Sequence, residues 1–169
     1  MHTLNSKKIT LTIGSGLRSF PLKKKFVKEM TNWLPIISGF ILKDLKKCGA
    51  GHLYLNLMIC GDHKVQRLNR EYRNKDKTTD VLSFPVYENL RGGKEQLFGP
   101  VDLGDIVVSW PVVLKQAKEF KVTNEQELIH LFVHGVLHLM GFDHELSRKE
   151  EIIMEKYEQE LVKKIYKKL

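Results

Sequence analysis

The segment from Thr123 to Met140 must form a helix that is buried at the centre of the fold. Thr123 and Gln126 have the spacing of an N-terminal capping box, and Gly141 is a residue type that commonly ends helices. Between these signals, apolar residues occupy nearly the whole helix circumference: Leu128, Ile129, Leu131, Phe132, Val133, Val136, Leu137, Leu139 and Met140. Because such a helix has no broad polar face for water, other elements must surround it.

Three histidines lie on this helix and on the turn that follows it. His134 and His138 are four residues apart, so their side chains lie on one helix face, one turn apart. Gly141 lets the chain turn back, and His144 can then supply a third nitrogen. Three histidine ligands leave a coordination position open, which is typical of catalytic zinc. We therefore predict one Zn²⁺ per chain, held by these three residues together with water or substrate.

The histidine spacing is also that of the metzincin metallopeptidases, but one position differs. Those enzymes carry a glutamate as general base directly after the first histidine. Here that position is Gly135, which has no group that accepts a proton. A metallopeptidase therefore remains an alternative that this residue disfavours.

The rest of the chain predicts an α+β fold, in which helices cover a small mixed sheet of about four strands. Strands are expected at Ile9–Ile13, Leu53–Cys60, Asp80–Phe84 and Leu103–Ser109. Helices are expected over Lys24–Lys47, Asp62–Tyr72, Pro111–Phe120 and Ser147–Tyr166, with a loop at Glu88–Pro100. Asp62 is expected to cap the second of these helices, and Ser147 and Glu150 have the capping-box spacing at the start of the last. Pro35 either kinks the first helix or divides it. The length of 169 residues fits one domain over 1–169, with the metal site on the buried central helix and the loop after it.

Charge and composition indicate a polyanionic partner. The chain has 28 Lys and Arg against 20 Asp and Glu, a net charge of +8 and a pI near 9.4. Such an excess attracts phosphates without sequence specificity. No apolar segment is long enough to cross a bilayer, and no secretory leader is expected. Cys48 and Cys60 are expected to be reduced, with at least one of them buried.

A second cluster of polar residues precedes the strand at Asp80. Arg67, Arg70 and Arg73 recur every third residue on the predicted helix. Arg73 stands at the helix end, before a charged turn, and from there its side chain can reach a cleft. A guanidinium suits charge that develops on a phosphoryl group. For Arg67 and Arg70 a solvated helix face is the simpler interpretation; together with Lys75 they are candidate contacts to the phosphates of a polyanionic substrate.

These motifs resemble the YbeY endoribonucleases, which are also called rRNA maturation factors. The resemblance covers about residues 53–160. It rests on His134-Gly-x-Leu-His138-Leu-x-Gly141-Phe-Asp143-His144, on Leu68-Asn69-x-x-Tyr72-Arg73-x-Lys75-Asp76 running into Thr79-Asp80-Val81-Leu82-Ser83-Phe84-Pro85, and on Leu103-Gly104-Asp105-Ile106, with Met154 and Glu158 in the closing helix. Thr78 departs from the family, which often has proline there.

The resemblance implies a metal-dependent endoribonuclease of the bacterial cytoplasm that acts on single-stranded RNA. It implies His134, His138 and His144 as metal ligands, with Arg73 as an essential residue beside the metal. Members of the family are implicated in maturation of the 16S rRNA 3′ end and in ribosome quality control, with the ribosome, ribosomal proteins and a GTPase as partners. Asp143, next to the third ligand, is a candidate orienting group or proton acceptor, or else a helix-terminal hydrogen-bonding group. A non-catalytic ribosome-binding factor with a structural zinc is the second alternative.

Overall fold

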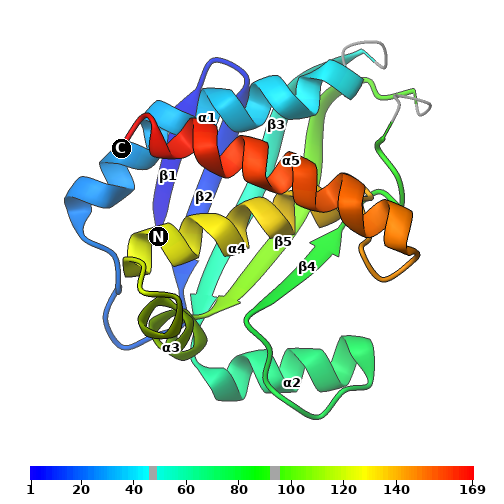
Figure 1. Cartoon of the computed structure of the whole chain (residues 1–169). Coiled ribbons are helices and arrows are strands. Elements are labelled where there is room, and N and C mark those ends of the chain that lie inside the picture. Colours follow the sequence, from blue (N-terminus) through cyan, green and yellow to red (C-terminus); the bar gives the residue numbers. More distant parts are fainter. Residues whose placement is uncertain (46–48, 92–95) are drawn as a thin grey trace.

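The computed structural model describes residues 1–45, 49–91 and 96–169. Strands and helices follow one another without regular alternation (Figure 1). In chain order they are β1 (His2–Ser6), β2 (Ile9–Ser15), α1 (Lys24–Leu45), β3 (Ala50–Cys60), α2 (Asp62–Arg73), β4 (Val81–Pro85), β5 (Gly99–Ser109), α3 (Trp110–Phe120), α4 (Asn124–Leu139) and α5 (Arg148–Tyr166).

The strands form one five-stranded mixed sheet in the order β1-β2-β3-β5-β4. The three inner strands, β2, β3 and β5, are parallel, with Ile13 opposite Leu57 and Leu57 opposite Ile106. Both edge strands are antiparallel to their neighbours. Parallel neighbours require a crossover, and α1 provides it between β2 and β3. From β3 the chain passes through α2 and β4 before it enters β5, and β4 pairs with β5 at the edge of the sheet.

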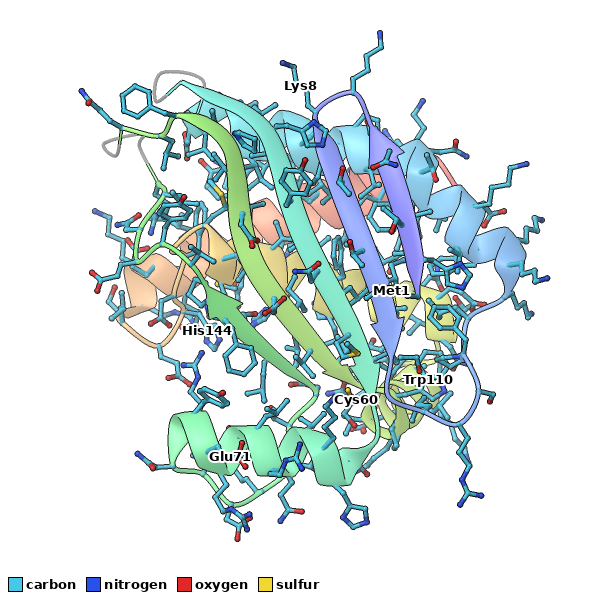
Figure 2. All side chains as sticks on the ribbon, turned by 180° about the vertical axis from the view of Figure 1, so that it is seen from behind. Met1, Lys8, Cys60, Glu71, Trp110 and His144 are labelled. Atoms are coloured by element: carbon cyan, nitrogen blue, oxygen red, sulfur yellow. The ribbon has the colours of Figure 1, made fainter. Side chains whose placement is uncertain are left out.

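Helices cover one face of the sheet and leave much of the other open. α1, α5 and α4 lie together over the covered face, with α5 between the other two, while α2 lies across one end of the molecule (Figure 1). From behind, the strands of the sheet are seen without a helix across them (Figure 2). The main core fills the space under the three helices, where the Trp33 and Phe132 ring centroids are 5.6 Å apart. The prediction that α4 is a buried helix is confirmed.

Several local predictions are confirmed at the atoms that define them. At the start of α4, Gln126 N donates to Thr123 Oγ1 (3.1 Å) and Thr123 N donates to Gln126 Oε1 (2.9 Å), which completes the capping box. Ser147 caps α5 through the backbone N–H of Glu150 (3.2 Å). α1 continues through Pro35 as one helix. The α+β class with a small mixed sheet is likewise confirmed.

Three local features differ from the predictions. The sheet has a fifth strand that was not predicted, β1, which is an edge strand held by backbone pairing to β2 and contributes little apolar burial. β5 begins at Gly99, inside the segment expected as a loop. Asp62 does not cap α2: Gly61 occupies the cap position, and the Asp62 carboxylate instead accepts from the Ser109 hydroxyl.

Two further expectations concern the cysteines and the membrane. Cys60 is buried and is a free thiol, whereas Cys48 lies outside the described residues. Among the described residues, no helix has both the length and the apolar character needed to span a bilayer.

Gly141 ends α4 in a conformation that other residues adopt at a cost, and this predicts a stability change. Its φ is +88°, and an added Cβ would stand 2.9 Å from the Asn89 Cα. We expect Gly141→Ala to lower the free energy of unfolding by about 1–3 kcal/mol, measured by urea denaturation.

Gly39→Ala is the matched control, because Gly39 lies inside α1 with nothing within 4 Å of an added Cβ. It should raise stability by about 1 kcal/mol through helix propensity. Equal effects of the two substitutions would show that the left-handed turn imposes no cost.

Candidate functional site

A cleft opens at the β4 edge of the sheet, between α4 and the C-terminal end of α2. Its volume is about 470 Å³. One wall carries histidines and acidic residues, and the other carries basic residues from the end of α2 and the turn after it. The residues that line it are Asn69, Arg73, Lys75, Lys77, Thr79, Asp80, Val81, Leu82, Ser83, His134, His138, Asp143, His144 and Glu145.

The three predicted histidines converge on one wall of this cleft. His134 Nε2 and His138 Nε2 are 3.1 Å apart, and the His144 ring centroid lies 5.2 Å and 5.3 Å from theirs. One ligand nitrogen from each ring falls within 4.8 Å of the others. Two nitrogens bound tetrahedrally to one zinc stand roughly 3.3 Å apart. The donor set and its spacing therefore fit a divalent metal of the zinc type.

The protonation of His138 also suits a metal ligand, because only neutral imidazole offers a lone pair. Burial, followed by the neighbouring His134 and His144, lowers the pKa of His138 to about 4. His138 is therefore neutral near pH 7.

The turn after α4 is fixed from several sides, which places His144. The Phe142 N–H donates to Leu137 O (3.0 Å), and the Asp143 carboxylate accepts from Glu145 N (2.9 Å). The Arg91 guanidinium lies 4.2 Å from the Phe142 ring centroid and pairs with Glu150 at the start of α5. Contacts from both neighbouring segments thus hold the third imidazole near the other two.

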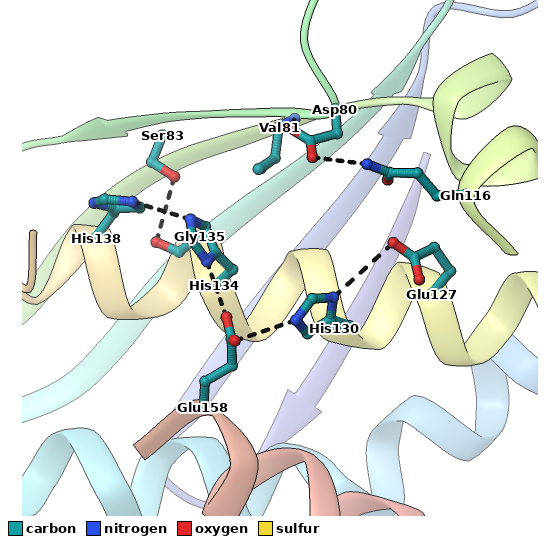
Figure 3. A network of polar contacts seen from close by, with 10 residues as sticks. All are labelled: Asp80, Val81, Ser83, Gln116, Glu127, His130, His134, Gly135, His138 and Glu158. Carbon is teal, nitrogen blue, oxygen red and sulfur yellow. Dashed lines mark hydrogen bonds and ion pairs between the residues drawn. The ribbon is translucent and has the colours of Figure 1, made fainter. Parts of the chain in front are cut away.

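A chain of polar contacts extends from His134 into the interface between α4 and α5 (Figure 3). His134 Nδ1 lies 2.9 Å from Glu158 Oε1, which leaves Nε2 toward the cleft. Glu158 Oε2 lies 3.2 Å from His130 Nε2, and His130 Nδ1 lies 3.9 Å from the buried Glu127. The Glu158 carboxylate thus fixes the tautomer and the orientation of His134, as is usual for metal-binding histidines.

The two middle members of this chain, His130 and Glu158, have pKa values shifted toward their charged forms. Hydrogen bonds to Glu127 and Glu158 raise the pKa of His130 to about 10. Burial acts to raise the pKa of Glu158, but hydrogen bonds with His130 and His134 outweigh it and bring the value to about 2. His130 and Glu158 therefore form an ion pair at neutral pH.

The role of Glu158 was not predicted from the residues alone, although a signal existed. Met154, Leu161 and Ile165 are the buried residues of α5, and Glu158 falls on the same helical stripe. A carboxylate within an apolar stripe must have a partner inside the protein. The same argument applies to Glu127, which is 3% exposed within α4.

The opposite wall is organised by two asparagines. Asn74 ends α2 in the left-handed conformation (φ 56°), and the buried Asn69 amide donates to Lys77 O (2.8 Å). These contacts shape the turn that carries Lys75 and Lys77. Arg73 Nη2 donates to Ser83 O (3.0 Å), which directs the guanidinium along β4 into the cleft. The structure thus brings Arg73 to the same cleft as the histidines.

The two walls meet where α4 approaches the sheet. The Ser83 hydroxyl donates to Gly135 O (3.4 Å), and a Cβ added at Gly135 would stand 2.9 Å from the side chain of Ile106. Position 135 therefore faces the sheet rather than the cleft. A glutamate there would have neither room nor access to a substrate.

The other predicted residues divide between the cleft and the surface. Lys75 and Asp143 line the cleft. Arg67 pairs with Glu71 (3.7 Å) and Arg70 with Asp76 (3.9 Å), and neither lines it. Asp80 lines the cleft, but its carboxylate accepts from Val81 N (2.8 Å) and from Gln116 (3.1 Å), which gives it a structural task (Figure 3).

Comparison with known proteins gives consistent matches over most of the chain. A sequence model described as "Endoribonuclease YbeY" matches residues 21–166. Proteins named Endoribonuclease YbeY include one from Persephonella marina, 34% identical over 92% of both chains, and one from Leptospira interrogans, 41% identical over 68% of this chain and 89% of its own length. A solution structure from Thermotoga maritima aligns with a TM-score of 0.59 and 26% identity, covering 92% of this chain and 89% of that one.

The contact between His134 and Glu158 predicts how substitutions alter metal affinity. We expect Glu158→Ala to weaken zinc binding by about 10- to 100-fold, because the His134 ring loses the group that orients it. Glu158→Gln should lose less, since its amide oxygen still accepts from His134 Nδ1. Competition against a chromogenic chelator measures the affinities.

Glu155→Ala is the control, on the exposed side of the same helix. Its zinc affinity should equal that of the unmodified protein. If Glu158→Ala also bound zinc normally, the carboxylate would have no part in orienting the ligand.

Proposed function

The chain belongs to the YbeY family of endoribonucleases, and we propose that it is a metal-dependent enzyme that cleaves single-stranded RNA in the cleft between α4 and α2. One observation carries this proposal: three histidines with metal-ligand spacing face Arg73 across a single cleft. A cation site opposite a guanidinium suits a phosphodiester, which is anionic and becomes more so as phosphorus is attacked.

We propose that His134, His138 and His144 hold one Zn²⁺ per chain. When bound, such an ion supplies a positive charge that polarises a phosphoryl oxygen and acidifies a nearby water. The imidazoles contribute neutral nitrogens, and Glu158 keeps the His134 ring in the binding orientation. Three ligands leave room in the coordination shell for water or substrate.

Arg73 is the proposed catalytic residue on the opposite wall. Its guanidinium has five N–H donors, and the Ser83 carbonyl accepts from one of its terminal nitrogens. The remaining donors can bind the oxygens of the scissile phosphate and stabilise their charge in the transition state. The anchoring bond to β4 limits the reorganisation that this requires.

Asp143 is the proposed proton acceptor. One of its oxygens accepts from Glu145 N, so the carboxylate also fixes the turn that carries His144. Its place in the cleft lining supports a role for the second oxygen in taking the proton from the attacking group. Asp80 is a poorer candidate for this task, because hydrogen bonds occupy both of its carboxylate oxygens.

Lys75 and Lys77 supply a basic border along which the RNA backbone would lie. Each phosphate that a lysine neutralises releases counterions and adds sequence-independent affinity. A single strand suits this narrow site because its backbone bends and its bases are free to turn outward. Arg67 and Arg70, paired on the outer side of α2, would contribute only to the long-range field.

Family membership and the net charge of +8 support a ribosomal substrate. We propose maturation of the 16S rRNA 3′ end and removal of defective ribosomes as the biological tasks. Ribosomal proteins and a GTPase are the proposed partners, and the bacterial cytoplasm is the proposed location. The main core draws on residues from Ile9 to Ile165, which supports one hydrolase domain over 1–169.

The metal proposal has a direct test. We expect the purified protein to contain one zinc per chain and to cleave single-stranded RNA, and chelation to abolish cleavage. His138→Ala should remain folded but lose both metal and activity, as measured by elemental analysis, circular dichroism and gel assay.

Other outcomes of these assays would identify the rival functions. Peptide products from an unstructured protein, without RNA products, would indicate a metallopeptidase. Unfolding of His138→Ala would indicate a structural metal in a binding factor.

The Arg73 proposal is tested separately. Arg73→Ala should lower kcat by about 100-fold or more, because a donor to the transition-state charge is lost. Its zinc content should not change, since the side chain bonds to β4 rather than to the histidines. Arg148→Ala removes one exposed positive charge outside the cleft lining and should keep full activity. Full activity in Arg73→Ala would remove this residue from the mechanism.

A further inference from the structure

A second groove lies on the open face of the sheet, along the side of α2 that carries Lys64, Leu68 and Tyr72. Its volume is about 570 Å³. Figure 2 shows this face from behind, with α2 crossing below the strands. The lining is largely apolar, with a few polar groups on one side: Met1, Thr12, Gly14, Asn56, Leu57, Met58, Lys64, Leu68, Tyr72, Phe84, Asp105 and Val107.

Two aromatic side chains form one wall of this groove. The Tyr72 and Phe84 ring centroids are 5.2 Å apart with an interplanar angle of 74°, so the rings meet edge to face. Phe84 packs against the small core cluster that includes Val65 and Leu82. Tyr72 is 65% exposed, so most of its surface is open to solvent. Phe84 is held by the core cluster and supports the exposed Tyr72 ring, which can therefore stack against a planar ligand.

The same two elements line both the groove and the cleft. On α2, Tyr72 lines the groove and the next residue, Arg73, lines the cleft; on β4, Phe84 lines the groove and Ser83 lines the cleft. Arg73 and Ser83 are hydrogen-bonded to each other (3.0 Å). Because β4 is an edge strand, no further strand separates the two hollows. A strand of RNA held at Arg73 would therefore reach the aromatic pair with an adjacent nucleotide.

The polar side of the groove favours a base over a phosphate. Asn56 Nδ2 donates to Asp105 Oδ1 (2.9 Å), and Asp105 is paired with Phe84 in the β4–β5 register, so a carboxylate lies next to the aromatic pair. A carboxylate repels phosphate but accepts hydrogen bonds from the N–H groups of bases. Lys64 is the basic residue of the lining and can meet the backbone outside.

We propose that Tyr72 and Phe84 form a stacking subsite for one base of the single-stranded RNA, next to the nucleotide whose phosphate lies at Arg73. The subsite rests on the proposed RNA-cleaving function and deepens it. It positions the strand across β4, so that cleavage requires an unpaired base on one side of the scissile bond. Duplex RNA is disfavoured, because its bases are already stacked and paired.

The test uses the zinc-loaded protein and single-stranded oligonucleotides in which one abasic site is moved along the sequence. For the unmodified protein, one position near the cleavage site should lower kcat/KM by roughly tenfold when its base is missing. In Tyr72→Ala, the intact substrate should show the same loss, and removal of that base should cause no further loss. Tyr72→Phe should restore the original pattern, because stacking needs the ring and not the hydroxyl.

Two controls separate stacking from general damage. Tyr72 is largely exposed, so Tyr72→Ala should melt at the temperature of the unmodified protein. Phe120→Ala removes another exposed ring, on α3 and outside the groove lining, and should leave every kcat/KM unchanged.

Two results would overturn the stacking subsite; one leaves the proposed RNA-cleaving function standing, and the other overturns that function as well. If Tyr72→Ala cleaves with normal kcat/KM, or keeps the same loss at the same abasic position, the base does not stack there. The groove would then be left to another occupant, such as a protein partner. If the unmodified protein neither binds nor cleaves RNA, the proposed function fails together with the subsite.

Discussion

The close approach of α4 to the sheet at Gly135 is the contact on which the site depends. With no side chain at this position, the helix backbone comes near enough to β4 for the Ser83 hydroxyl to reach Gly135 O, and Ile106 fills the space that a Cβ would need. The neighbouring His134 then lines the cleft, near Ser83 of β4, whose carbonyl oxygen accepts from Arg73. This one packing contact therefore sets the distance between the two walls of the cleft. The same contact leaves no room at position 135 for the catalytic glutamate of a metallopeptidase.

Much of the fold and the centre of the site could be predicted from the sequence, because the signals were local. The capping box of α4, the all-round apolar surface of that helix and the glycine at position 141 each act within a few residues. The spacing of His134, His138 and His144 encodes its own geometry once the helix is assigned. The family resemblance rested on the histidine motif and on the segments 68–85 and 103–106, with Met154 and Glu158, and it implied a role for Arg73. The position of Arg73 at a helix end indicated only that its side chain could reach a cleft.

Other features could not be predicted, because they depend on partners distant in sequence. β1 has polar residues and pairs with β2 through its backbone, so no burial pattern marked it. Asp62 has the residue type of a helix cap but bonds to Ser109, which only the β3–β5 pairing brings near it. The partner of His134, Glu158, is on another helix. The aromatic pair of Tyr72 and Phe84 likewise arises only when α2 is laid against β4.

All three candidate ligands come from one short segment, 134–144, whereas Arg73 reaches them through the long-range assembly of α2 and β4. Closing a loop of this length costs little chain entropy, so a cation that bridges it removes few alternative conformations from the unfolded chain. The free energy of metal capture is thus coupled mainly to the local order of the turn after α4, and only weakly to global unfolding. The scaffold can complete its folding before it is metallated, and an ion can exchange without dismantling the sheet.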